Sequence, residues 1–246
     1  MRLGRTIGPA GVARRLASLP EKPLNFDLQA LSNPAVEEGW RRTDLRQPLA
    51  PEAPGPPVAG GTFEIAQRLM SGYEFADPSI VQAYYDEHVP LQRRNMLLKL
   101  KALGLVHVFV GVRVGEVYEL TREVDGRRAR VWGWNYRTLE GHVEQGQMDW
   151  QVWKWLDDGG VEFRVHAISR PAPISNPLVA LGFRLLGERE RRVFLDSTRS
   201  RMLAFTQRAL RERDGAGAVR AAAEGQTARA DAEAAEAHER LARRLR

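Results

Sequence analysis

Residues 130–171 decide the fold of this chain: RVWGWNYRTLEGHVEQGQMDWQVWKWLDDGGVEFRVHAISRP. This stretch holds all but one of the six tryptophans. Its aromatic residues alternate with other residues at Trp132, Trp134 and Tyr136, and successive side chains of a strand point to opposite faces. The alternation therefore predicts a strand with an aromatic face.

Two more strands follow in the same stretch. One runs from about Gln147 to Leu156, and the other from Val161 to Arg170 after a turn at Asp157–Gly160. The second strand carries alternating apolar residues on one side, namely Val161, Phe163, Val165 and Ala167. Consecutive strands joined by short turns predict an antiparallel sheet.

The residues before this stretch extend the sheet. Val106–Val112 alternate with period two, Gly115 is expected to turn the chain, and Val117–Thr121 form the return strand. Asp125–Gly126 is a hairpin signal ahead of a strand over Arg128–Thr138.

A long helix is predicted after the sheet. Asn176–Pro177 is a typical helix start, and the pattern continues to about Arg213 with a kink at Gly187. One face of this helix is apolar and should cover the sheet: Phe194, Thr198, Met202, Phe205 and Ala209.

The region ahead of the sheet is less clear. Phe63–Phe75 fits either a first strand or a helical turn, and we favour a strand. Asp77–Pro78 predicts a helix to residues 84–85, and Pro90 opens a second helix that Gly104 ends.

Three segments are expected. Residues 1–61 are rich in proline and form an arm and linker, with Trp40 as its anchor if the arm packs on the domain. Residues 62–213 form the domain. Residues 214–246 are an extension rich in Ala, Arg and Glu that buries little apolar surface.

Composition narrows the function classes. The chain has 246 residues, a formal net charge of +6 and no cysteine, so thiolate chemistry and disulfides are excluded. We expect a cytoplasmic protein, although an Arg-rich transit peptide stays open for residues 1–20. No apolar run is long enough to cross a membrane. No phosphate loop, nucleophile elbow or RNA-binding motif occurs, so we expect no cofactor and no nucleic-acid partner.

The element order is that of an α+β helix-grip domain, in which a curved antiparallel sheet packs around a long C-terminal helix. Thr62 to about Leu210 resembles the DUF1990 (UPF0548) family, related to the START and Bet v 1-like (SRPBCC) superfamily. The resemblance rests on Tyr136–Leu139, Gly141, His142, Glu144, Gly146 and Ala167–Pro171. The chain departs from the family pattern at Val143, Gln147, Met148 and Ile168. The resemblance implies a fold with room for a cavity between sheet and helix, and no established activity.

The aromatic face has two open interpretations. Trp132, Trp134 and Tyr136, together with either Trp150 or the pair Trp153 and Trp155, form an aromatic wall. Such a wall can line a pocket for an apolar ligand, or it can fill the core between sheet and helix.

Polar candidates lie in the same stretch. His142 and Glu144 share a turn bounded by glycines and could act as an acid–base pair, or they could hold the turn through backbone hydrogen bonds. His166 is the one strand-borne third ligand for a metal, and because this is no recognised zinc pattern we predict no metal site.

Three arginines on neighbouring strands complete the candidates: Arg137, Arg164 and Arg170. A guanidinium can hold a carboxylate or phosphate with two hydrogen bonds. The alternative is internal pairing with Glu140, Glu144 or Glu162.

These features favour a binding module for a small apolar or amphipathic ligand, with an acidic head meeting Arg137 or Arg170. Alternatives are an enzyme acting on such a ligand through His142 and Glu144, and a structural or interaction protein that docks through its C-terminal helix and tail. The sequence leaves open whether catalysis occurs, and it does not determine the oligomeric state.

Overall fold

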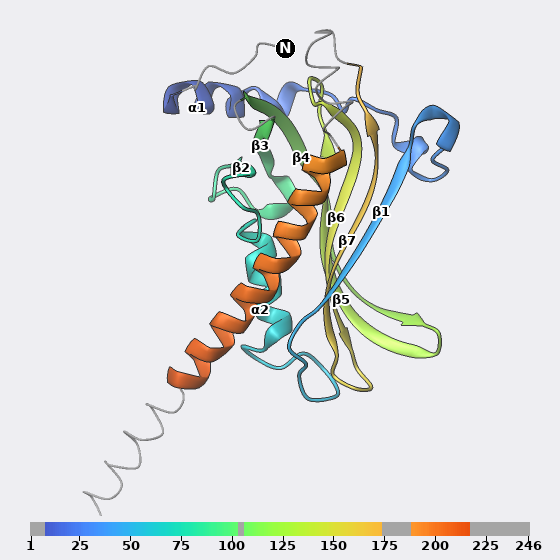
Figure 1. Ribbon diagram of the computed structural model, residues 1–246, viewed down its shortest axis with the longest axis vertical. Helices are drawn as coiled ribbons and strands as arrows, with labels where there is room; N and C mark the ends of the chain where they lie inside the picture. Colours follow the sequence, from blue (N-terminus) through green and yellow to red (C-terminus); the bar gives the residue numbers. More distant parts are fainter. Residues whose placement is uncertain (1–7, 103–105, 174–187, 217–246) are drawn as a thin grey trace, which may run out of the picture. The chain divides into compact units, whose positions relative to one another are not determined.

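The structure is a computed structural model that describes residues 8–102, 106–173 and 188–216. In these residues the strands form one seven-stranded antiparallel sheet in the order β1-β7-β6-β5-β4-β3-β2 (Figure 1). The strands are β1 (Arg41–Pro48), β2 (Val81–Tyr84), β3 (Asn95–Ala102), β4 (Val106–Val124), β5 (Arg127–Thr138), β6 (Glu144–Trp155) and β7 (Val161–Pro171). The predicted antiparallel sheet is confirmed.

The helices are short except for the last. They are α1 (Pro9–Ala17), α2 (Thr62–Ser71) and the 3-10 turns η1 (Leu19–Glu21), η2 (Leu28–Leu31), η3 (Val36–Glu38) and η4 (Leu91–Arg93). The C-terminal helix is described over residues 188–216. Among the described residues, no helix is both long and apolar enough to span a bilayer.

The sheet has an inner face, which the C-terminal helix covers, and an outer face. Phe194 of the helix meets Trp150 of β6 edge to face, with ring centroids 6.2 Å apart. Thr198 and Met202, further along the helix, are fully buried. The predicted helix face is confirmed at Phe194, Thr198 and Met202. The curved sheet gripped by this helix is the helix-grip fold. The predicted helix start and the kink at Gly187 lie outside the described residues.

The chain divides into two compact units, Met1–Thr206 and Gln207–Arg246. The described part of the second unit continues the helix to residue 216, with an ion pair between Arg208 and Glu212 at 2.7 Å.

The expected first strand is wrong, because Thr62–Ser71 form the helix α2. Its buried side chains recur at helical spacing: Thr62, Phe63, Ile65, Ala66, Leu69 and Met70. This period of three and four lets one stripe of a helix enter the core, whereas a strand would expose half of these residues.

The two helices expected next are also wrong. Residues 81–84 form β2, and β3 follows the 3-10 turn η4. Met96, Leu97 and Leu98 of β3 are all buried, because side chains on both faces of this part of the sheet are covered. A continuous apolar run of this kind has no period of two and cannot be told from a helix by its pattern.

Gly115 does not turn the chain. β4 continues through it as one 19-residue strand, with a bulge between Val114 and Val117. A Cβ atom at Gly115 would lie 2.8 Å from Cζ of Arg137, so glycine makes room for the side chains of β5. The hairpin at Asp125–Gly126 is confirmed.

The N-terminal segment takes part in the sheet. β1 pairs antiparallel with β7 from Arg41↔Ser169 to Pro48↔Glu162, so residues 41–48 are an edge strand. Trp40 is buried and lies under the guanidinium of Arg170, 4.8 Å from its Cζ. The domain boundary expected at residue 61 stays a prediction.

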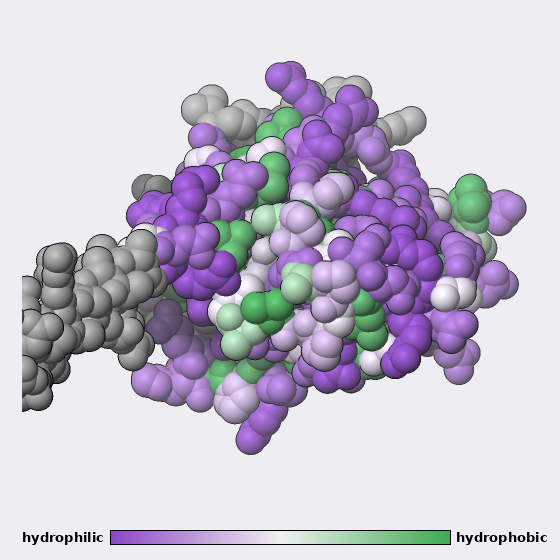
Figure 2. Space-filling model, turned by 90° about the horizontal axis from the view of Figure 1, so that it is seen from below, coloured by the Kyte–Doolittle hydropathy of each residue, from purple (hydrophilic) through white to green (hydrophobic). Residues whose placement is uncertain are grey.

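The loop between β1 and α2 is fixed by a buried ion pair. Lys154 Nζ of β6 lies 3.0 Å from Glu52 Oε2, with both side chains almost fully buried, and it donates to Ala53 O at 2.7 Å. The Glu52 carboxylate also accepts from the amides of Val58 and Phe63. Figure 2 views the molecule from the end where this loop lies, and shows a small apolar area ringed by hydrophilic side chains.

Candidate functional site

An aromatic cluster fills the space between the inner face and the C-terminal helix. The ring centroids of Trp134 and Tyr136 in β5 lie 6.1 Å apart. The centroid of Trp150 in β6 lies at the same distance from that of Tyr136. Four further rings from other elements join them: Tyr73, Phe75, Phe163 and Phe194. Trp134 and Trp150 are completely buried. These rings therefore fill the core between the sheet and the described part of the helix.

The sequence left two choices for the rest of the wall, and the structure selects Trp150. Because β6 alternates, Trp153 and Trp155 project from the outer face and pack with Ala129 and Val131. Trp132 lies on the inner face and is 6% exposed.

The cluster contains polar atoms that lack partners. Among the described residues, five buried side-chain atoms make no hydrogen bond: Tyr73 Oη, Trp134 Nε1, Trp150 Nε1, Thr198 Oγ1 and Arg94 Nε. Three of them belong to the cluster and Thr198 to the helix that covers it. Leaving such a group unpaired costs about 1–3 kcal/mol, so their concentration in one place requires a physical reason.

Tyr73 stands at the centre of this arrangement. Burial and the nearby Tyr136 hydroxyl raise the pKa of Tyr73 well above its ordinary value, although the two hydroxyls do not meet in good hydrogen-bond geometry. Burial likewise raises the pKa of Tyr136, whose hydroxyl donates to Met148 Sδ at 3.4 Å. Both hydroxyls therefore stay protonated at neutral pH: the Tyr136 hydroxyl donates to Met148, and the Tyr73 hydroxyl has a proton to donate.

The backbone around Tyr73 is held in an uncommon conformation. Its φ of 57° lies in the left-handed region, which costs a residue with a side chain about 1–2 kcal/mol. Two arginines hold the backbone on either side of Tyr73 in the sequence: Arg94 donates to Ser71 O at 2.8 Å, and Arg201 donates to Phe75 O at 3.2 Å. The turn therefore presents Tyr73 to the cluster at a defined position.

A groove of about 990 Å³ borders this turn. Its walls come from α1, from β2 and from the C-terminal helix around Arg201 and Phe205, and Tyr73 is part of its lining. Tyr84 and Tyr85 contribute aromatic surface from the edge of the sheet. Tyr73 thus belongs both to a solvent-facing groove and to the buried cluster.

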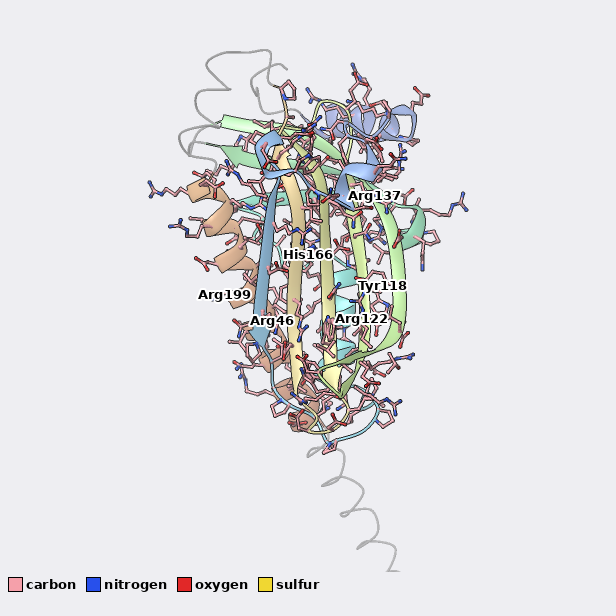
Figure 3. The ribbon with its side chains drawn as sticks, turned by 90° about the vertical axis from the view of Figure 1, so that its right-hand side faces the viewer. Arg46, Tyr118, Arg122, Arg137, His166 and Arg199 are labelled. Atoms are coloured by element: carbon pink, nitrogen blue, oxygen red, sulfur yellow. The ribbon has the colours of Figure 1, made fainter. Side chains whose placement is uncertain are left out.

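The three candidate arginines lie on the outer face, because their positions alternate with the inward-facing residues of β5 and β7. Figure 3 shows Arg137 on this face. Arg137 donates to Gln147 at 2.8 Å and pairs with Glu116 at 3.0 Å. Arg164 pairs with Glu162 at 2.8 Å. Each of these two arginines therefore has an internal acceptor.

Arg164 and Arg170 also stack on tryptophans of the outer face. Arg164 Cζ lies 3.9 Å from the centroid of the Trp153 ring, and Arg170 pairs with Glu38 at 3.0 Å while it covers Trp40. Stacked and paired guanidinium groups of this kind shield apolar surface from water.

His142 is bound to the backbone of its own turn. Its Nδ1 lies 2.9 Å from the amide nitrogen and 3.0 Å from the carbonyl oxygen of Glu144, and its tautomer decides which contact is the hydrogen bond. Burial lowers the pKa of His142 to about 4, so the ring is neutral at physiological pH. The Glu144 carboxylate does not contact the ring and turns to the C-terminal helix.

Arg191 of that helix is a site residue that the sequence reasoning missed. Its guanidinium donates to Glu144 Oε1 at 3.2 Å, to Ser169 Oγ at 2.9 Å and to Thr43 Oγ1 at 2.8 Å. The signal was present, because Arg191 precedes Phe194 by three residues and so shares its helix face. A guanidinium thus joins β1, β6 and β7 beside Tyr136.

His166 lies on the outer face, where its Nδ1 is 2.7 Å from Asp44 Oδ1. In the part of the chain that the structure describes, no three acidic or histidine side chains come together in a way that could hold a metal ion.

Comparison with known proteins adds a family. The chain is similar to the crystal structures of Ara h 8.0201 (TM-score 0.37, 11% identity, 68% of this chain and 99% of that one) and of the di-domain ARO/CYC StfQ from the steffimycin biosynthetic pathway (0.45, 13%, 86% and 63%). It is also similar to human STARD10 (0.31, 10%, 72% and 82%). Likenesses this weak say nothing about what the chain binds.

No curated protein matches the sequence. The family model described as "Domain of unknown function (DUF1990)" matches residues 27–210, which include β1 and end within the C-terminal helix. The match covers more than half of the chain and all seven strands. The chain therefore belongs to the DUF1990 family.

Proposed function

We propose that this protein is a binding module for a small apolar or amphipathic ligand held between the inner face of the sheet and the C-terminal helix. The observation that carries the proposal is the group of buried polar atoms without partners: Tyr73 Oη, Trp134 Nε1, Trp150 Nε1 and Thr198 Oγ1. A ligand that reaches them supplies the missing hydrogen bonds, which are worth about 0.5–1.5 kcal/mol each.

The chemistry of these atoms defines the ligand. An indole N–H only donates, and the protonated hydroxyl of Tyr73 donates as well. The ligand therefore carries oxygen acceptors such as carbonyl groups. The rings around these donors favour a flat, apolar body that stacks or meets them edge to face.

The groove supplies the route. It is open to solvent, it has the volume of a small-molecule site, and Tyr73 forms part of its wall. Entry of the ligand requires the Tyr73 and Phe194 rings to change rotamer, because the cluster is closely packed in the free protein.

The first test is native mass spectrometry of gently purified protein, which should show a bound small molecule. The second compares fluorenone with fluorene by quenching of tryptophan fluorescence. The two share one flat body, and only fluorenone has a carbonyl acceptor. Fluorenone should bind about tenfold more tightly, because one added hydrogen bond is worth about 1 kcal/mol or more.

Variants separate the site from the rest of the protein. Tyr73→Phe should abolish the preference for fluorenone, whereas Tyr118→Phe should not, because the Tyr118 hydroxyl bonds Gln151 on the outer face. Without ligand, Tyr73→Phe should leave the unfolding free energy unchanged or raise it, since an unpaired hydroxyl is removed. Absence of a co-purified molecule together with equal or no binding of both probes would overturn the proposal.

A further inference from the structure

The contacts of Arg191 point to the chemical class of the ligand head, an inference that rests on the proposed ligand site. We infer that Arg191 binds an anionic head group, carboxylate or sulfonate, and that the Glu144 carboxylate occupies the place of this group in the free protein.

Arg191 is built into the inner face. Its side chain is 16% exposed, and it hydrogen-bonds groups from three strands, two of which are the hydroxyls of Thr43 and Ser169. These two hydroxyls keep the guanidinium in place whether or not Glu144 is bound. A guanidinium fixed in this way is prepared for an anion with two neighbouring oxygens, which it binds through two parallel hydrogen bonds.

The Glu144 carboxylate can be displaced from Arg191. Its carboxylate meets Arg191 through one oxygen at 3.2 Å, which is longer than an ordinary charge-assisted bond, and its side chain is 39% exposed. When Glu144 rotates toward solvent, its carboxylate becomes hydrated and is not left buried without a partner. The incoming anion takes its place, so Arg191 stays paired. The ion pair is exchanged and not broken.

The pair adjoins the aromatic cluster. The charges of Glu144 and Arg191 both act on the hydroxyl of Tyr136, and Tyr136 is in ring contact with Tyr73 and Trp150. An anion at Arg191 thus lies at one end of the row of donors, so a single amphipathic molecule can place its head at Arg191 and its acceptors and apolar body along the cluster.

The outer face offers a matched control. Arg164 pairs with Glu162 through one oxygen at 2.8 Å, and this pair lies on the opposite side of the sheet from the proposed ligand. The same substitutions made there change charge and pairing in the same way without touching the inner face.

The test measures the dissociation constants of naphthoate and naphthamide, which share one body and differ in charge. Wild-type protein should prefer naphthoate by about tenfold, since hydrogen bonds to charged groups are worth about 1.5–3 kcal/mol and displacement of Glu144 offsets part of this. Arg191→Gln should abolish the preference. Glu144→Gln should increase it about fivefold or more by removing the competing anion. Arg164→Gln and Glu162→Gln should change neither value.

Glu144→Gln retains the arginine and its two hydroxyl contacts, so it tests the exchange even where Arg191→Gln disturbs folding. Equal binding of the two probes by wild-type protein, or a Glu144→Gln variant with unchanged or weakened naphthoate binding, would overturn the inference. In that case binding of fluorenone that still depends on Tyr73 would leave the proposed ligand site standing, so the two failures are distinguishable.

Discussion

Replacing Lys154 with methionine should destabilise the protein by about 3–5 kcal/mol, the usual effect of removing one partner of a buried ion pair. Lys154 is fully buried, and its ammonium group lies 3.0 Å from Glu52 and 2.7 Å from the carbonyl oxygen of Ala53. Methionine keeps much of the volume of the side chain. The variant therefore leaves the Glu52 carboxylate buried without its counter-charge.

The remaining contacts of Glu52 reduce the loss of stability. The Glu52 carboxylate keeps its hydrogen bonds from the amides of Val58 and Phe63 at 2.9 and 2.8 Å, which offset part of the loss. The double variant Lys154→Met, Glu52→Gln removes the charge as well as the partner. It should recover part of the lost stability, because no unpaired charge stays buried, although the single amide oxygen of glutamine can accept from only one of the two backbone groups.

Urea unfolding followed by tryptophan fluorescence measures the effect. With a slope of about 2 kcal/mol per molar urea, a loss of about 4 kcal/mol moves the midpoint down by about 2 M. The control is Lys101→Met, which changes an exposed lysine of β3 and should stay within about 0.5 kcal/mol of wild type. A midpoint for Lys154→Met equal to that of this control, or a double variant less stable than the single one, would refute the reasoning.

Three further predictions concern other contacts. Burial lowers the pKa of His142 to about 4, so its neutral ring contributes stability that is complete above about pH 6.5 and is lost as the pH falls toward 4. This loss, on the order of 3 kcal/mol, should be absent when the unfolding free energy of His142→Gln is measured against pH. Gly146→Ala should lower the midpoint of thermal unfolding by 5 °C or more, about 1–2 kcal/mol, because φ is +146° and a Cβ atom would collide with the carbonyl oxygen of Ile168; an unchanged midpoint would contradict this. Arg113→Ala removes hydrogen bonds to the carbonyl oxygens of Leu19, Pro20 and Lys22, so amide hydrogen exchange in residues 19–22 should quicken about tenfold while the β5–β6 amides exchange as before.

The candidate site was predicted in part. The alternation at Trp132, Trp134 and Tyr136 correctly placed these residues on one face, and the fold put that face against the C-terminal helix. The sequence reasoning also grouped Arg137 and Arg170 with them, but odd and even positions of neighbouring strands put those arginines on the outer face. Their ion pairs with Glu116 and Glu38 depend on a bulge and on the N-terminal segment, neither of which the local pattern reveals.

Arg191 shows the converse case. Its contacts with Thr43, Glu144 and Ser169 join positions up to 148 residues apart. Its spacing from Phe194 indicates the helix face on which it lies, but it does not indicate these partners. Only the crossing of the helix over the sheet brings the guanidinium to the inner face.

The sequence by itself determined the elements whose period is visible in their own residues. These include β5, β6 and β7 with the hairpin at Asp125–Gly126, the apolar face of the C-terminal helix, and the family signature around residues 136–171. The alternation of a strand and a glycine-containing turn are local properties of the chain. They can therefore be recognised in the sequence when the partner strands are not known.

The tertiary structure decided what depends on burial from both sides and on distant partners. Residues 95–102 are a strand because of what covers them, and a short apolar run such as Met96–Leu98 has no period that could distinguish a strand from a helix. The placement of Trp150 inside and Trp153 outside, the pairing of Lys154 with Glu52, and the position of Arg191 were settled in the same way. Each of these features depends on contacts between segments that are far apart in the sequence. Such contacts stabilise the fold only once the segments have come together, so no local pattern reveals them.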